Sequence, residues 1–250
     1  YVDITVLRGE NAEETPLHVE RRSIEVPTVE YQMLENQVGY IYVTQFDEVT
    51  AKQFEDAIDD LEDQGMEKLV IDLRNNPGGV LDTAVEMLAY VLPEDKLDGM
   101  LVYTADKNGE GDRYFCKDGK IQRESDDGSR VSRYPKEDDH ELDVPLAVLV
   151  NGNSASASEV FTGAVMDYDA GIVVGTTTFG KGIVQNLIPL GDGTAIKLTT
   201  AHYYTPNGFD LHGKGLEPDV VVEMDEELQK KAVVELSEDN QLQAAIEAMN

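Results

Sequence analysis

Two nearly continuous apolar runs constrain the fold of this chain most strongly. Residues 68–73 and 144–150 lack the alternation of polar and apolar side chains that a half-exposed strand shows, and a turn and a helix-spaced apolar pattern follow each run. Such runs are typical of strands that helices cover on both faces of a largely parallel sheet. The succession of strand, turn and helix therefore predicts an α/β layered domain.

A further strand and helix precede the first of these runs. Residues 38–43 predict a strand, and the segment after it has one apolar helix face. We expect this helix to begin at a capping box of Thr50 and Gln53 and to end at Gly65. Its apolar face consists of Phe54, Ala57, Ile58 and Leu61.

The rest of the chain divides into segments by composition. Residues 1–8 alternate apolar and polar side chains as a half-buried strand does, and 9–36 read as a connector. The main α/β core pattern covers 37–225. Within it, 96–142 is rich in Asp, Glu, Lys, Gly and Ser and predicts an inserted β-rich excursion. Residues 226–250 form an acidic segment with helical spacing.

The composition excludes several classes of function. Fifty acidic and 20 basic residues give a net charge of −30, which repels nucleic acid and anionic membranes. The single cysteine, Cys116, excludes an internal disulfide and a cysteine-rich metal site, and no other metal motif occurs. We therefore expect no metal, no cofactor and no nucleic-acid partner. The chain opens with the strand-like YVDITVLRG and no methionine, so we expect it to start inside a longer protein.

A turn with three serines follows the second apolar run. Ser154, Ser156 and Ser158 alternate with alanine just before a predicted helix. The free N–H groups and the dipole at a helix start favour developing negative charge, as a nucleophile there requires. However, Ser156 and Glu159 also match a capping box, which needs no catalysis. The turn alone leaves both roles open.

Lys181 is the candidate general base. It stands between two glycines and beside the apolar residues Phe179, Ile183 and Val184. A lysine among apolar neighbours is desolvated, which favours the neutral form that accepts a proton. Gln185 follows four residues later and would point to the same side of an extended segment, where its amide can orient the amine.

Histidine is the usual partner of a catalytic serine, so a serine–histidine pair is an alternative. The chain has four histidines: His18, His140, His202 and His212. The first two lie in polar segments, and the last two flank residues 203–208, from which they could reach a cleft. None has the setting of a recognisable triad.

The turn at 76–79 is a second candidate element of the site. Consecutive glycines at the head of a helix let backbone N–H groups face a ligand. The N–H groups of Gly78 and Gly79, together with that of Ala157, are therefore candidates for an oxyanion hole. A plain tight turn explains the local pattern equally well. The lysine and Ser/Thr of a phosphate-binding loop are absent.

Taken together, the chain resembles the C-terminal processing peptidases, also called tail-specific proteases. The match consists of four ordered blocks: residues 72–79, 150–159, 175–185, and 204–208 with 213–219. The resemblance implies a crotonase-like α/β core and a Ser156–Lys181 dyad extended by Gln185. The interval between serine and lysine in that family selects Ser156 over Ser154 and Ser158.

The resemblance also implies protein or peptide substrates with accessible C-termini and an extracytoplasmic place of action, whether periplasmic, membrane-anchored or secreted. A homo-oligomer is compatible with it. Members of the family usually carry a PDZ domain before the core, and residues 1–8 are similar only to the last strand of one. The alternative function is a catalytically inactive peptide-binding module on the same fold. The retention of Ser156, Lys181 and Gln185 argues against it.

Overall fold

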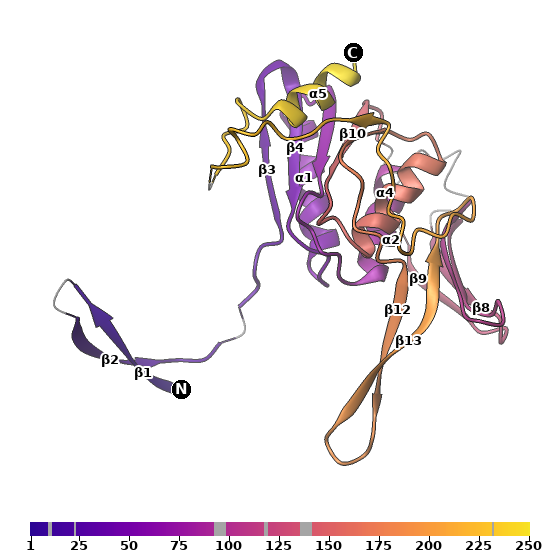
Figure 1. Cartoon of the computed structure of the whole chain (residues 1–250), viewed down its shortest axis with the longest axis horizontal. Coiled ribbons are helices and arrows are strands. Elements are labelled where there is room, and N and C mark those ends of the chain that lie inside the picture. The colour runs from indigo at the N-terminus through magenta and orange to yellow at the C-terminus, as the bar shows by residue number, and fades with distance from the viewer. Residues whose placement is uncertain (10–11, 23, 93–98, 118–119, 136–141, 232) are drawn as a thin grey trace.

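The computed structural model describes residues 1–9, 12–22, 24–92, 99–117, 120–135, 142–231 and 233–250 (Figure 1). A six-stranded sheet in the order β14-β11-β10-β5-β4-β3 forms the centre of the body. All neighbours in it are parallel except β3, which pairs with β4 in the antiparallel sense. Its strands are β3 (Val29–Met33), β4 (Val38–Val43), β5 (Lys68–Asp72), β10 (Leu146–Val150), β11 (Ile172–Gly175) and β14 (Val220–Val221).

Helices cover both faces of this sheet, which explains the continuous apolar runs. Three helices pack on one face: α1 (Thr50–Asp63), α2 (Leu81–Val91) and α4 (Ala157–Asp167). Alternate strand residues such as Ile71 and Val148 join them in the main core, while Val70 and Leu149 point to the other face. There α5 (Asn240–Ala248) packs against the sheet.

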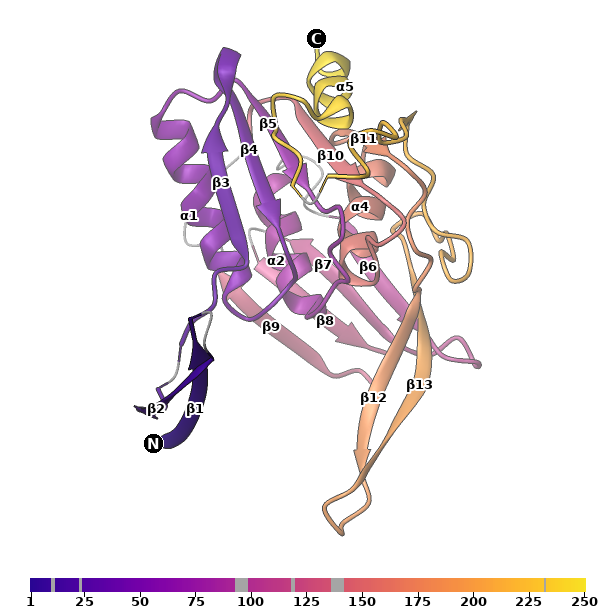
Figure 2. The ribbon, with the colours of Figure 1, turned by 60° about the vertical axis from the view of Figure 1, so that its left-hand side comes forward.

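A second sheet of six antiparallel strands, in the order β12-β13-β6-β7-β8-β9, lies on the far side of the helix layer. Figure 2 shows it running beneath α2 and α4. The predicted excursion at 96–142 supplies four of its strands, although 96–98, 118–119 and 136–141 lie outside the described residues. The strands are β6 (Met100–Ala105), β7 (Asp112–Lys117), β8 (Lys120–Ser125), β9 (Arg130–Pro135), β12 (Ile183–Pro189) and β13 (Ala195–Tyr204).

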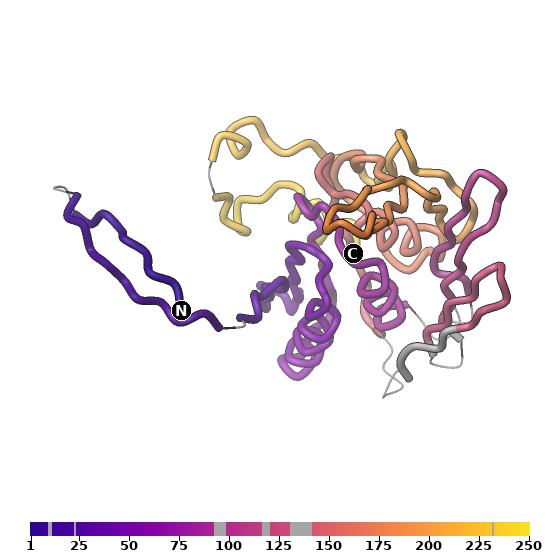
Figure 3. Tube along the Cα trace, turned by 90° about the horizontal axis from the view of Figure 1, so that it is seen from below, coloured from indigo at the N-terminus to yellow at the C-terminus, as the bar shows by residue number. Residues whose placement is uncertain are grey.

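The N-terminal segment forms a hairpin that lies apart from the body (Figures 1 and 3). Its strands β1 (Val2–Arg8) and β2 (Glu13–Val19) pair only with each other among the described residues. The core sheet then starts at β3, inside the stretch 9–36 that the sequence suggests as a connector. A short 3₁₀ turn, η1 (Glu35–Gln37), joins β3 to β4.

Two local predictions are wrong. Thr50 and Gln53 do not cap α1; the Thr50 hydroxyl accepts from the Asp47 N–H, and Gln53 Oε1 accepts from the Thr28 N–H at 2.9 Å. Tertiary partners thus replace the local cap. In the acidic tail, regular helix begins only at Asn240, where the Asp239 carboxylate caps α5. Gly65, with φ 83°, ends α1 as expected.

No helix in the described part of the chain is both long enough and apolar enough to cross a membrane.

Candidate active site

Ser156 occupies the sharp turn between β10 and α4. Its backbone has φ 58° and ψ −114°, a conformation that residues other than glycine seldom adopt. Ser156 and Glu159 are the N-cap and N3 residues of α4, and the Ser156 N–H donates to Glu159 Oε2 at 2.9 Å. The capping-box interpretation therefore describes real contacts. A serine on a strained turn between a strand and a helix is also the geometry of a nucleophile elbow.

The two neighbouring serines have structural contacts instead. The Ser154 hydroxyl donates to the Leu73 carbonyl at 2.7 Å, and the Ser158 hydroxyl donates to the Asn76 carbonyl at 2.9 Å. Both side chains are fully buried, whereas Ser156 is partly exposed. These contacts tie the serine turn to the glycine turn and favour Ser156 as the serine that a substrate can reach.

The Glu159 carboxylate joins the serine turn to the lysine turn. It is fully buried and accepts four hydrogen bonds. Oε2 accepts from the N–H groups of Ser156 at 2.9 Å and Lys181 at 2.8 Å. Oε1 accepts from the Thr178 hydroxyl and the Gly180 N–H, both at 2.6 Å. Because buried carboxylates need such donors, this network fixes both backbones relative to one another.

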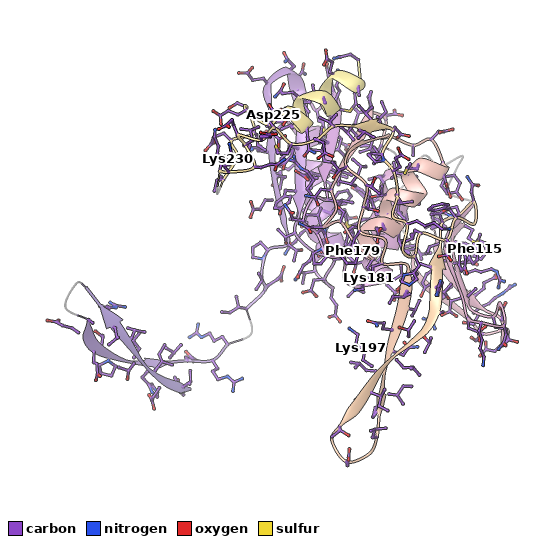
Figure 4. The ribbon with its side chains drawn as sticks, viewed as in Figure 1. Phe115, Phe179, Lys181, Lys197, Asp225 and Lys230 are labelled. Atoms are coloured by element: carbon purple, nitrogen blue, oxygen red, sulfur yellow. The ribbon has the colours of Figure 1, made fainter. Side chains whose placement is uncertain are left out.

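Lys181 lies two residues before the start of β12, at the root of the β12–β13 hairpin (Figure 4). Its side chain is half-buried, and among the described residues its Nζ pairs with no carboxylate. Phe179, in contrast, is 64% exposed. Gly180, with φ 85°, turns the chain between the two residues; the shielding of Lys181 by Phe179 stays a prediction. Ile183 and Val184 are half-buried.

Among the residues that the structure describes, Gln185 makes no hydrogen bond to Lys181. It lies on β12, is exposed, and its amide donates to Thr199 Oγ1 on β13 at 3.3 Å. Lys181 and Gln185 do not belong to one regular extended segment, in which side chains four residues apart would point to the same side. Lys181 precedes the strand, and the β12–β13 register shifts between Val184 and Gln185.

The glycine turn lies against the serine turn. A Cβ on Gly78 would be 2.8 Å from the Ala157 nitrogen and 2.8 Å from Ser156 Cβ, so only glycine permits this approach. The Gly78 N–H donates to Asn76 Oδ1 at 2.9 Å. Within the described residues, the N–H groups of Gly79 and Ala157 have no acceptor. Of the predicted oxyanion donors, only Gly78 therefore uses its N–H in a hydrogen bond within the described residues.

The histidines do not hydrogen-bond to Ser156 among the described residues. His202 Nδ1 lies 3.5 Å from Asp210 Oδ2, and the His202 and His212 rings meet edge-on at 4.9 Å. His18 stacks on Tyr1 in the N-terminal hairpin. His140 lies outside the described residues.

Two residues to which the sequence pattern assigned no role of their own, Asn76 and Thr178, connect the turns of the site. Asn76 donates to the Val43 carbonyl at 2.8 Å, and its own carbonyl accepts from the Ala155 N–H at 3.0 Å. The Thr178 hydroxyl donates to Glu159 and accepts from the Leu216 N–H at 2.8 Å. The sequence gives only a weak signal for these two residues, because each is simply a polar residue in a turn that contains glycine. Through these contacts the blocks at 72–79, 150–159, 175–185 and 213–219 meet at one place.

Asp72 and Arg74 of the first block are not part of the serine and lysine turns, because Arg74 contacts the C-terminal segment on the opposite face of the sheet. Arg74 Nε donates to Asp72 Oδ1 at 3.0 Å, its Nη2 to Asp239 at 2.7 Å and its Nη1 to Gln241 at 2.9 Å. Burial acts to lower the pKa of Arg74, but the hydrogen bonds and charges of Asp72 and Asp239 outweigh it and raise the pKa. Burial, together with the Asp72 charge, raises the pKa of Tyr40, which donates to Asp72 at 2.7 Å. This network anchors the C-terminal segment to the sheet.

The sequence profile of peptidase family S41 matches residues 37–222, which contain the whole of this site. The chain belongs to peptidase family S41. The "Probable CtpA-like serine protease" of Staphylococcus aureus strain COL is 38% identical over 222 residues, which cover 89% of this chain and 40% of that protein. The relative of the same description in Staphylococcus epidermidis is also 38% identical over 222 residues. The chain thus spans less than half the length of these S41 relatives.

Solved structures agree with this family. The photosystem II D1 C-terminal processing protease superimposes with a TM-score of 0.62 at 28% identity, over 89% of this chain and 56% of that one. A lipoprotein from Streptococcus agalactiae superimposes with a TM-score of 0.56 at 21% identity, over 78% of this chain and 65% of that one. The second likeness concerns the fold alone. The predicted α/β protease core is confirmed as the S41 fold.

Proposed function

We propose that this chain is the catalytic core of a serine endopeptidase, with Ser156 as nucleophile and Lys181 as general base. One observation carries the proposal. Ser156 is held in a strained backbone conformation by the same buried Glu159 carboxylate that holds the backbone of Lys181. Strain of this kind persists where the surrounding contacts enforce it, and it occurs preferentially at functional sites.

The proposed chemistry is acyl transfer. Neutral Lys181 takes the proton of the Ser156 hydroxyl as the oxygen attacks the peptide carbonyl. The N–H groups of Gly79 and Ala157 stabilise the oxyanion, helped by the start of α4. Lys181 returns the proton to the leaving amine, and water then hydrolyses the acyl-enzyme. Gln185 orients the Lys181 amine in this scheme, which requires its amide to leave Thr199.

The substrates proposed are proteins or peptides cleaved near an accessible C-terminus, in line with the name of the D1 C-terminal processing protease. An extracytoplasmic place of action and a regulatory PDZ domain, of which residues 1–8 would be the last strand, belong to the same proposal. Homo-oligomerisation is compatible with it.

Cleavage assays test the two catalytic assignments. Purified protein is incubated with unfolded casein and an internally quenched peptide, alongside Ser156→Ala and Lys181→Ala. Loss of each group removes the nucleophile or its base, so we expect activity to fall by at least about a thousandfold. Ser129→Ala and Lys107→Ala are matched controls at exposed positions, and we expect them to retain full activity.

Undiminished cleavage in either catalytic variant would rule out the dyad. The inactive-module alternative predicts another result, in which the protein binds C-terminal peptides and leaves them intact, with equal affinity in Ser156→Ala.

A further inference from the structure

The β12–β13 hairpin extends well beyond the body of the molecule (Figures 1 and 2). In the second sheet β12 is an edge strand, and within the described residues no strand pairs with its outer side. An edge strand directs the N–H and C=O groups of alternate residues outward, where they can pair with another extended chain.

The side chains of this hairpin are unusually apolar for their exposure. Leu187 is 71% exposed and Leu190 is 55% exposed. The strand register puts Ile188 opposite Ile196, and Leu198 follows on the same face, so these three partly exposed side chains form one apolar face. An exposed apolar surface of this kind marks a binding site.

The hairpin also differs in charge from the rest of the chain. Between residues 183 and 200 only Asp192 and Lys197 are charged, whereas the whole chain carries −30. A second copy of this chain would carry the same net charge of −30, and the overall repulsion between the two copies disfavours self-association. An extended polypeptide with apolar side chains and little negative charge fits the surface better.

The free edge of β12 leads directly to the candidate active site. β12 starts two residues after Lys181, and the Gly182 carbonyl accepts from the Tyr203 N–H at 3.0 Å, which continues the ladder toward the lysine turn. Figure 4 shows Lys181 at the root of the hairpin and Lys197 farther along it. A chain that pairs with β12 therefore runs toward Lys181 and Ser156.

We propose that the substrate binds as an added strand on the outer edge of β12, with apolar side chains beside Ile188, where Ile196 and Leu198 of β13 continue the apolar face. Main-chain hydrogen bonds then supply affinity, and the apolar face selects apolar sequence. The substrate class is an unfolded or locally extended polypeptide segment, apolar and without negative charge. This inference rests on the proposed peptidase function.

Three measurements on the purified protein test it. The first is kcat/KM for an internally quenched peptide of alternating leucine and alanine, with and without two glutamates. The second is a scan of single backbone N-methyl groups along the same peptide. The third is the rate at which a small alkyl fluorophosphonate, which does not need the hairpin, labels Ser156. All three are applied to wild type, to the double variant Ile188→Thr/Ile196→Thr and to Ile24→Thr, an exposed apolar control outside the hairpin.

Strand addition predicts that N-methylation lowers kcat/KM at every second position. The hairpin double variant should cleave the apolar peptide about tenfold less efficiently, mainly through KM, and should label at the wild-type rate. Ile24→Thr should match wild type in both assays. Glutamates in the peptide should lower kcat/KM by about tenfold as well.

Labelling at the wild-type rate together with undiminished peptide cleavage in the double variant would overturn the inference and leave the peptidase proposal standing. The inference would also be overturned if sedimentation showed a dimer for wild type and a monomer for the double variant while peptide cleavage stayed unchanged. Absence of both labelling and cleavage in wild type would contradict the peptidase proposal, and the inference with it.

Discussion

At the scale of single residues, the Glu159 carboxylate connects the two halves of the site. Its two oxygens accept from Ser156, Thr178, Gly180 and Lys181, so the relative position of the proposed nucleophile and the proposed base depends on one buried side chain. From sequence, Glu159 is visible only as the partner in a capping box. Its other hydrogen bonds come from residues about twenty positions later in the chain, and no local sequence pattern predicts such contacts.

We expect Glu159→Gln to separate positioning from folding. The amide turns a donor toward N–H groups that need acceptors, which should lower the free energy of unfolding by about 1–3 kcal/mol. The rate of fluorophosphonate labelling at Ser156 should fall more than tenfold at temperatures where the variant is folded. Urea unfolding and labelling kinetics measure the two effects. Glu217→Gln, an exposed control near the same turns, should change neither; an unchanged labelling rate in Glu159→Gln would show that the carboxylate only stabilises the fold.

At the scale of elements, the strands and helices of the core could be predicted from the sequence, whereas for the second sheet only the β-rich character of 96–142 could be predicted and not the pairing of its strands. The runs at 68–73 and 144–150 are nearly continuous in apolar residues because α1, α2 and α4 cover one face of the sheet and α5 covers the other. The strands β6 to β9 come from a polar segment that pairs through β6 with β13, about a hundred residues later. Such pairing depends on non-local contacts, and propensity does not specify them.

The contact between the glycine turn and the serine turn can be tested with a matched pair of glycines. Gly78 has φ 94°, and a Cβ there would lie 2.5 Å from the Ala155 carbonyl oxygen. Gly109 has φ 83° and nothing within 4 Å of its Cβ position. Gly78→Ala should therefore lower the free energy of unfolding by about 1–3 kcal/mol more than Gly109→Ala, because it adds a steric clash to the same backbone strain.

Urea unfolding of both variants gives this difference, and labelling of Ser156 should slow only in Gly78→Ala. Equal losses of stability in the two variants would mean that the turns do not need the close approach seen here.

At the scale of the whole molecule, the C-terminal segment is fastened to the sheet by ionic contacts. Arg74 lies between Asp72 and Asp239, and α5 covers the face opposite to the active site. The sequence places Asp72 and Arg74 inside a conspicuous block near the glycine turn. Their partner in the tail lies 165 residues away, so only the folded chain shows that they anchor this segment.

Substitutions at two neighbouring acidic residues, Asp239 and Glu238, compare the buried ion pair with an exposed one. Asp239→Asn removes a buried partner of Arg74 and weakens the cap of α5, and we expect a loss of about 3–5 kcal/mol. Glu238→Gln breaks only the exposed pair with Lys231 and should cost less than about 1 kcal/mol. Urea unfolding at neutral pH measures both; similar small losses would indicate that the Arg74 network does not hold the tail in place.

The choice of Ser156 among three serines was supported from sequence only by family resemblance, and the structure adds a physical argument for it. Ser154 and Ser158 are buried and bound to carbonyls, whereas Ser156 lies on a strained turn that a substrate can reach. The pairing of this serine with Lys181 is the central claim.

Mass spectrometry of the fluorophosphonate adduct tests that claim most directly. Peptide mapping of the labelled protein should place the adduct on Ser156 alone, and Lys181→Ala should label at least about a hundredfold more slowly. An adduct on Ser154 or Ser158, or labelling of Ser156 at an unchanged rate in Lys181→Ala, would contradict the account.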